Sequence, residues 1–450
     1  MTYDLVISGT LVLSDQIVRD GWLAVSGEKI AAIGEGELPP HARFIDAFGK
    51  YLVPGLVDGQ THATSYKGLP GIDVTSQSAL AGGITTMVDM PYDNPDPLNT
   101  VERFKAKRDA VETYSHCDVA LYATVAPGQG TSEMLPLAKE GVCAFKISSI
   151  ESHPVRFPRL PADEMMEILQ ASVTTGLPVG LHNEDQEIVR ARIAHYKAAG
   201  QVTPEYHELS RPVAAELAAT AQFLELGRAT GAHVHIVHIS TPLGFQMVKD
   251  YAQAGVRATG ELCVHYLHFD AGRDIERLGA RMKVSPPIRA GLVDGLWEEV
   301  EQGRVAFISS DHSSWPIDNK LTDSIFDAGA GIPGLETMLP SFITDAAPRY
   351  GLDGAMQRLA THFSLHPAQF FGLYPRKGAL AVGADADIAV IEPSTYVYDE
   401  AQNHDGLNWS PYDGETFSAR VAATVRRGEV VYSEGQILST AGSGRYIPRT

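Results

Sequence analysis

The chain has 450 residues, with 36 Lys and Arg against 55 Asp and Glu, which gives a formal net charge of −19. An acidic chain without a basic cluster repels phosphate backbones and anionic lipid heads, so we expect neither nucleic acid nor a membrane as a partner. No apolar stretch reaches the length of a membrane span, and the first residues do not resemble a secretion signal, so we expect a cytoplasmic protein.

The three cysteines, Cys117, Cys143 and Cys263, are widely spaced and do not form a thiolate metal motif. An odd number of scattered cysteines suits a reducing compartment. We expect all three to be small buried side chains.

The first fifty residues alternate apolar and polar positions between glycines, which predicts short strands and turns. From Tyr51 to about Ile308 brief apolar runs are each followed by a longer amphipathic stretch, which is typical of parallel β/α units. The predicted strands are Leu52–Val57, Thr85–Val88, Val119–Thr124, Ala144–Ile147, Val179–Leu181, His235–Val237, Ala258–Cys263 and Ala306–Ser309. This repetition predicts an α/β fold with a TIM (β/α)8 barrel.

After a helical stretch through Phe371, strands return at Asp387–Ile391 and Ala419–Tyr432. We expect the two chain ends to build one small β-sandwich together. The predicted domains are the barrel at residues 52–374 and the two parts of the sandwich at residues 1–51 and 375–450.

The segment Asp58-Gly59-Gln60-Thr61-His62 follows the first predicted barrel strand. Alternate side chains of a strand point the same way, so residues i and i+2 at a strand end can bind one cation together. Two histidines would be a typical pair, but Gln60 stands at the first position. Because Zn-like ions prefer imidazole nitrogen to an amide oxygen, we expect Gln60 to be a weak or lost ligand.

Four more candidate ligands stand at the ends of other predicted strands: Lys146, His182, His238 and Asp311. In a TIM barrel such positions share one face, so these side chains and His62 are expected to converge. Burial lowers the pKa of a lysine, and its neutral amine can add carbon dioxide to form a carbamate that bridges two cations. Structural interpretations also exist: a snorkelling Lys146, a hydrogen-bonded core His182 and an Asp311 that caps a helix.

Three histidines crowd the sixth predicted strand. By alternation, His233 and His235 share a face opposite to His238. We favour His238 as the ligand because it ends the run.

Together with several motifs, these residues resemble the cyclic amidohydrolases, the group of hydantoinases, allantoinases, dihydropyrimidinases and dihydroorotases. The resemblance runs nearly end to end and is closest to hydantoinases and allantoinases. The motifs include Val53-Pro54-Gly55-Leu56-Val57-Asp58, Gly82-Gly83-Ile84-Thr85-Thr86-Met87, Ser210-Arg211-Pro212, Lys283-Val284-Ser285-Pro286-Pro287-Ile288-Arg289, Gly334-Leu335-Glu336-Thr337 and Ser410-Pro411-Tyr412-Asp413-Gly414.

The resemblance implies one or two divalent metals per chain, with Zn as the first choice, bridged by N6-carboxylated Lys146 and a hydroxide. The ligands of one metal would be Gln60, His62 and Asp311, and those of the other would be His182 and His238.

The resemblance also implies roles in the reaction. The hydroxide attacks the ring carbonyl, and Asp311 takes its proton and delivers it to the departing ring nitrogen. The substrate ring is expected to be held by Ser285, Ala330 and Gly331. The segment after Lys146 lacks the tyrosine with which some hydantoinases support the oxyanion.

The expected function is hydrolytic opening of a small cyclic amide or ureide, with a hydantoin as the first substrate and allantoin as the alternative. A second alternative is a non-catalytic scaffold of the same fold that has lost a metal ligand at Gln60. A third is hydrolysis of a linear amide or ester at a one-metal centre. The resemblance implies a homodimer or homotetramer.

Overall fold

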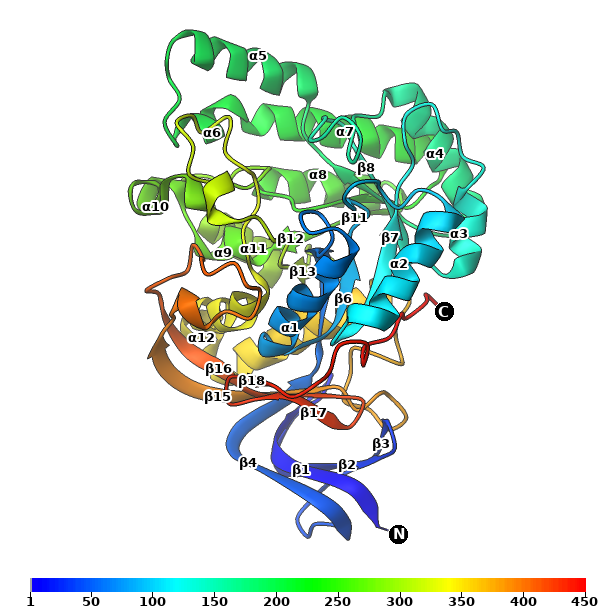
Figure 1. Cartoon of the computed structure of the whole chain (residues 1–450), viewed down its shortest axis with the longest axis vertical. Coiled ribbons are helices and arrows are strands. Elements are labelled where there is room, and N and C mark those ends of the chain that lie inside the picture. The colour runs from blue at the N-terminus through cyan, green and yellow to red at the C-terminus, as the bar shows by residue number, and fades with distance from the viewer. Residues whose placement is uncertain (1) are drawn as a thin grey trace.

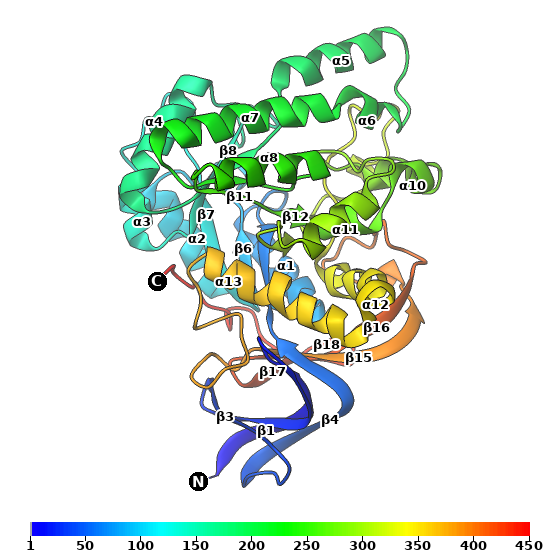
Figure 2. The same cartoon turned by 180° about the vertical axis from the view of Figure 1, so that it is seen from behind.

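The structure is a computed structural model that describes residues 2–450. Figure 1 shows a curved sheet at the bottom, which contains the amino-terminal strands, and a larger unit of strands and helices above it. Seen from behind in Figure 2, the stretch from α12 (Leu335–Ala360) to α13 (His366–Phe370) lies between these two parts. None of the helices in residues 2–450 is both long and apolar enough to cross a bilayer.

Parallel strands form the barrel of the upper part, and its ring closes where β12 pairs with β13 and β14 pairs with β5. The barrel strands are β5 (Leu56–His62), β6 (Ile84–Asp89), β7 (Asp118–Ala123), β8 (Ala144–Ser148), β9 (Val179–His182), β10 (Val234–Ile236), β11 (Ala258–Gly260), β12 (Leu262–Cys263), β13 (Ile308–Ser309) and β14 (His312–Ser313). The last two barrel positions are each divided between two short strands. The predicted TIM barrel is confirmed.

Each predicted barrel strand overlaps an observed one, but none has the same bounds. The run Leu52–Val57 spans the end of β4 (His41–Pro54) and the start of β5, which are separated by Gly55. A side chain at Gly55 would bring its Cβ within 2.3 Å of Oγ1 of Thr85, so the backbone at Gly55 packs directly against the Thr85 side chain. The run Ala258–Cys263 is interrupted at Glu261, and β10 ends at Ile236 instead of Val237.

Helices connect and cover these strands. They are α1 (Ile72–Ala81), α2 (Val101–Tyr114), α3 (Met134–Glu140), α4 (Ala162–Thr175), α5 (Gln186–Ala198), α6 (Tyr206–Ser210), α7 (Val213–Thr230), α8 (Pro242–Gln253), α9 (Val264–His268), α10 (Ala271–Leu278) and α11 (Val293–Glu301), followed by α12, η4 (Thr361–Leu365) and α13, with short turns η1 (Leu69–Gly71), η2 (Gly279–Met282), η3 (Ile317–Asn319) and η5 (Glu400–Gln402). Two helices begin soon after candidate ligands because a side chain caps them. Asp185 accepts a hydrogen bond of 2.8 Å from the backbone N–H of Ile188, and Thr241 accepts one of 3.4 Å from Leu243.

Both chain ends contribute to one eight-stranded sheet, in the order β18-β17-β16-β15-β4-β1-β2-β3. Its strands are β1 (Tyr3–Val12), β2 (Ile17–Ser26), β3 (Lys29–Glu35), β4 (His41–Pro54), β15 (Ile388–Val397), β16 (Thr416–Arg426), β17 (Glu429–Ser433) and β18 (Gln436–Ile437). The two ends meet where β4 pairs antiparallel with β15. Apolar side chains from both ends, among them Leu5, Leu52 and Ile388, share one core, as the sequence predicts.

Lys377 ties this sheet to the barrel. Its buried Nζ lies 2.6 Å from Asp118 of β7, 2.9 Å from Asp385 and 2.7 Å from Asp387. The three carboxylates converge as metal ligands do, but the ammonium lies between them. This cluster is therefore a structural ion-pair network.

We expect Lys377→Met to lower the free energy of unfolding by about 3–5 kcal/mol, because the substitution removes the cation that contacts three buried carboxylates. Lys29→Met is the matched control: Lys29 contacts Asp385 at 2.6 Å, but 46% of its side chain is exposed. Exposed pairs contribute less than about 1 kcal/mol. Urea unfolding measures both, and equal losses would contradict the role assigned to Lys377.

Candidate metal centre

The candidate ligands lie at the carboxyl ends of the barrel strands. His62 ends β5, Lys146 lies in β8 and His182 ends β9. His238 and Asp311 each follow a strand by two residues, after β10 and β13. The fold thus brings together buried or nearly buried polar side chains from segments far apart in the sequence.

His238 and Asp311 share an unusual backbone conformation. Their φ angles are 40° and 48°, in the left-handed region. For residues with a side chain such a conformation costs about 1–3 kcal/mol and persists where surrounding contacts hold it. The strained turns follow the strand ends directly, which is why periodicity does not predict where these two side chains point.

Gln60, His62 and Asp311 meet at one point. Nε2 of Gln60 donates a hydrogen bond of 2.7 Å to Oδ1 of Asp311, and Nε2 of His62 lies 3.3 Å from the same oxygen. Ligand atoms on a tetrahedral Zn lie about 3.3 Å apart, because the bonds to the metal are about 2.0–2.1 Å long. The spacing of these side chains therefore suits a divalent cation.

The amide oxygen of Gln60 is available as a metal ligand. Its Oε1 is buried, and within residues 2–450 nothing donates a hydrogen bond to it. A half-turn of the amide exchanges its oxygen and nitrogen, whose assignment rests on hydrogen bonding alone. The turned side chain would present this unpartnered oxygen to a cation beside Asp311 and His62, so the residues fit a metal even without a first histidine.

Asp311 is ionised at neutral pH. Burial raises the pKa of its carboxyl group, but the hydrogen bond from His62 and the charge interactions with His62, His238 and Lys146 outweigh burial, so the pKa lies below its usual value. An ionised carboxylate can bind a cation or accept a proton.

Asp58 holds this half of the site in place, although the sequence analysis does not single it out. Its Oδ1 accepts a hydrogen bond of 2.8 Å from the backbone N–H of Ser310, and its Oδ2 accepts one of 2.6 Å from the Ser310 hydroxyl. Asp58 therefore joins β5 to the residue before Asp311. The signal available in the sequence was alternation, because Asp58, Gln60 and His62 share one face of the strand.

His182 and His238 form the other half. Nδ1 of His182 lies 2.9 Å from Nε2 of His238. The other ring nitrogen of His182 lies 2.9 Å from Oε2 of Glu184, which Arg211 contacts at 2.5 Å. A carboxylate that accepts the Nε2 proton leaves Nδ1 of His182 with a free lone pair, as metal-binding histidines need. Glu184 is the second residue that the sequence analysis missed, two positions after its histidine.

Lys146 is buried beside two aromatic rings. Its Nζ lies 5.9 Å from the ring centre of Tyr92 and 5.8 Å from that of Phe157. Burial lowers its pKa below the usual value. A larger neutral fraction of the amine makes reaction with carbon dioxide more favourable.

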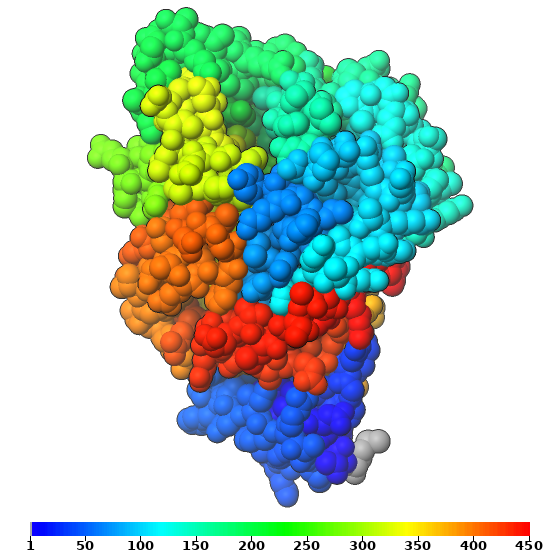
Figure 3. Space-filling model, viewed as in Figure 1, coloured from blue at the N-terminus to red at the C-terminus, as the bar shows by residue number. Residues whose placement is uncertain are grey.

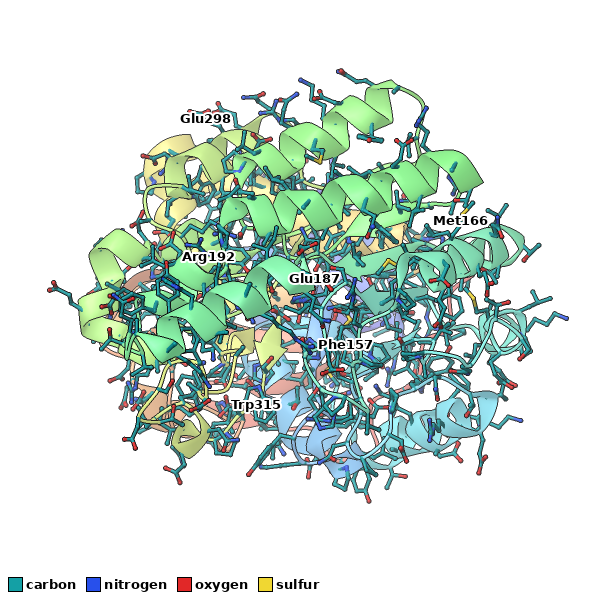
Figure 4. All side chains as sticks on the ribbon, turned by 90° about the horizontal axis from the view of Figure 1, so that it is seen from above. Phe157, Met166, Glu187, Arg192, Glu298 and Trp315 are labelled. Carbon is teal, nitrogen blue, oxygen red and sulfur yellow. The ribbon has the colours of Figure 1, made fainter. Side chains whose placement is uncertain are left out.

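Tyr92 and Phe157 stack on each other at 3.4 Å between ring centres, and Tyr92 also meets the edge of His62 at 5.0 Å. Phe157 belongs to the loop between β8 and α4, and Arg156 of that loop donates to the carbonyl of Ser65. In the view from above in Figure 4, Phe157 lies between Glu187 and Trp315. The loop after Lys146 contains no tyrosine, but Tyr92, which follows β6, places an aromatic ring near Lys146 and His62.

The residues expected to hold the substrate are placed side by side. Gly331 donates its N–H to the carbonyl of Lys283 at 2.9 Å, and Lys283 lies two residues before Ser285. Gly331 has φ 119°, and a Cβ there would lie 2.5 Å from Cβ of Ser313. A side chain is therefore excluded at Gly331, which is buried, whereas the neighbouring Ala330 is partly exposed.

Comparison with known proteins finds relatives that match along nearly the whole chain. An allantoinase of Deinococcus radiodurans is 33% identical over 454 residues, which cover 100% of both chains. An L-hydantoinase of Paenarthrobacter aurescens is 31% identical over 455 residues, which cover 99% of this chain and 98% of that one. The solved structure of the L-hydantoinase (dihydropyrimidinase) from Arthrobacter aurescens matches with a TM-score of 0.94 and 31% identity over 100% of both chains.

The profile of the amidohydrolase family matches residues 51–431, which include every candidate ligand. The resemblance inferred from the motifs is thereby confirmed, and the chain belongs to the amidohydrolase family.

Proposed function

We propose that the protein hydrolyses a ring amide bond of a small cyclic amide or ureide, with a hydantoin as the first candidate substrate and allantoin as the second. The observation that carries this proposal is the convergence of Gln60, His62 and Asp311 at one point and of His182 and His238 at another. The allantoinase and the L-hydantoinase resemble this chain almost equally, at 33% and 31% identity, so similarity alone does not choose between the substrates.

The proposed cofactor is a divalent metal, Zn in the first place, with one or two ions per chain. A bound cation of this kind lowers the pKa of a water molecule and polarises the scissile carbonyl. His182 and His238 would hold one ion. Gln60, His62 and Asp311 would hold the other. The N6-carboxylated form of Lys146 would contact both ions. The site that contains Gln60 is the weaker one, because an amide oxygen replaces an imidazole.

Residues of the chain itself transfer the proton and hold the substrate. Oδ1 of Asp311 faces Gln60 and His62, so Oδ2 takes the proton from the attacking water and returns it to the departing ring nitrogen. The backbone of Ser285, Ala330 and Gly331 would hold the ring amide. Water is excluded on the aromatic side by Tyr92 and Phe157.

A non-catalytic scaffold explains the site less well. Buried polar groups are expensive to fold. A scaffold gains nothing from burying Lys146, His182, His238 and Asp311 together at strand ends.

The test combines metal content, mass and activity. Protein purified without chelator should contain at least one divalent metal per chain and carbon dioxide on Lys146 by native mass spectrometry. It should open hydantoins or allantoin, lose this activity with chelator and regain it with metal. Lys146→Ala should abolish the activity, while the exposed control Lys139→Ala should not.

Other outcomes are equally informative. Faster turnover of allantoin than of any hydantoin would make allantoin the substrate. A protein that takes up neither metal nor carbon dioxide and opens no ring, even with added divalent ions and bicarbonate, would overturn the proposal.

We also propose a cytoplasmic homodimer or homotetramer. The support for a reducing compartment is that all three cysteines are buried and unpaired. Light scattering after gel filtration measures the assembly, and a monomer at micromolar concentration would contradict it.

A further inference from the structure

Residues 314–331 form a segment that leaves the barrel close to Asp311 and returns to it. The backbone N–H of Ser313 donates to the carbonyl of Ile332 at 2.9 Å, and His312 forms a β-bridge with Ile332. In Figure 3 this yellow segment lies on the surface between the green helices and the orange stretch that precedes β16. Ala330 and Gly331 end the segment, so whatever holds it also shapes the proposed substrate site.

Lys320 is buried inside this segment, and its ammonium faces backbone carbonyls. Nζ donates to the carbonyl oxygens of Lys283 at 2.7 Å, Gly329 at 2.9 Å and Gly331 at 2.8 Å. Three acceptors match the three hydrogens of an ammonium group. Burial and the charge of Lys283 lower the pKa of Lys320, and no acidic group of residues 2–450 counters them.

Lys283 contacts the same segment through its own side chain. Its Nζ donates to the carbonyls of Ile325 at 2.6 Å and Ala328 at 2.5 Å. Its own carbonyl accepts both from Gly331 N–H, at 2.9 Å, and from Lys320. The two lysines thus connect residues 325–331 of the segment with Lys283.

Trp409, in the loop between η5 and β16, lies beside Lys320. Its ring centre lies 5.7 Å from Nζ of Lys320, and its Nε1 donates to the carbonyl of Trp315 at 2.8 Å. Nζ of Lys320 therefore lies among three carbonyls with an aromatic ring nearby, and these contacts offset part of the cost of burying a cation.

A buried ammonium without a carboxylate is a poor way to stabilise a fold, because apolar side chains fill the same volume without losing hydration. It does determine which oxygens lie together, since three directed hydrogen bonds meet at one atom. That atom here contacts Lys283, two residues before Ser285, and Gly331 itself.

We propose that Lys320 is a positioning residue for the reaction: it sets the spacing between the backbone at residues 283–285 and at residues 329–331, between which the substrate ring is held. This inference rests on the function proposed above.

The test is the kinetics of Lys320→Met with the ring that the wild-type protein opens. A displaced binding backbone reduces rates by about 100-fold, so we expect kcat/KM to fall by that factor, mainly through KM. The metal content and the amount of carbon dioxide bound to Lys146, measured by native mass spectrometry, should stay as in the wild type. Hydrogen exchange of the full chain should accelerate at Gly331, whose N–H is bonded to Lys283.

Two controls separate positioning from stability. Lys197→Met removes an exposed contact to the same segment, the 2.8 Å ion pair with Asp327, and should leave KM unchanged. Lys377→Met removes an equally buried lysine far from the segment in sequence, and should lower stability without changing KM. If Lys320→Met does not fold, Lys320→Ala with n-propylammonium in the buffer should recover both folding and KM.

Two results would overturn the inference. An unchanged KM in a folded Lys320→Met protein that has lost stability, as expected for Lys377→Met, would show a merely structural lysine. If the wild-type protein opens no ring, the proposed function is wrong, and the inference that rests on it is wrong as well.

Discussion

Asp311→Asn is expected to lower kcat for ring opening by about 1,000-fold, within the range of general acid–base catalysis. Asparagine keeps the shape of the side chain and one oxygen, but it cannot take a proton from water and return it to a ring nitrogen. Because the wild-type carboxylate is held ionised by its contact with His62, the substitution removes a charge as well as a proton acceptor. Chromatographic assay of the opened product measures the effect.

Two checks make this result specific. Asp318→Asn changes an exposed aspartate nearby in the chain and should leave kcat unchanged. Metal content is measured on the same samples, because Asp311 is also a proposed ligand. An Asp311→Asn protein with full metal content and wild-type kcat would exclude Asp311 from proton transfer.

Gln60→His is expected to raise the affinity for a second divalent ion by about tenfold or more. The side chain of Gln60 already reaches Asp311 at 2.7 Å, so an imidazole nitrogen placed there would meet the same point as Nε2 of His62. The wild-type protein should retain about one tightly held metal per chain, and the variant two. Elemental analysis after dialysis against a weak chelator measures the difference.

Gln60→Leu is the matched control, because it fills a similar volume without a donor atom and should keep one ion. Two tightly held metals in the wild-type protein would contradict the weak-ligand argument. So would a Gln60→His protein whose second ion is no better retained.

Much of the fold was accessible from the sequence because it depends on local periodicity. Apolar runs followed by amphipathic stretches predicted the barrel, and alternation at Gln60 and His62 predicted a shared face. The errors arose where the backbone departs from regular geometry, at the close approach of Gly55 to Thr85 and at the interruption by Glu261.

The sequence by itself determined the barrel, the family resemblance and the candidate ligands, because strand ends and motifs are local features. Only the tertiary structure decided how those ligands are held: Asp58 contacts Ser310, 252 residues away in the sequence, and Glu184, itself held by Arg211, orients His182 toward His238. The role of Lys320 is the feature that the sequence indicates least. Every residue carries a backbone carbonyl, so no side-chain pattern indicates which carbonyls a buried lysine will contact until the chain has folded.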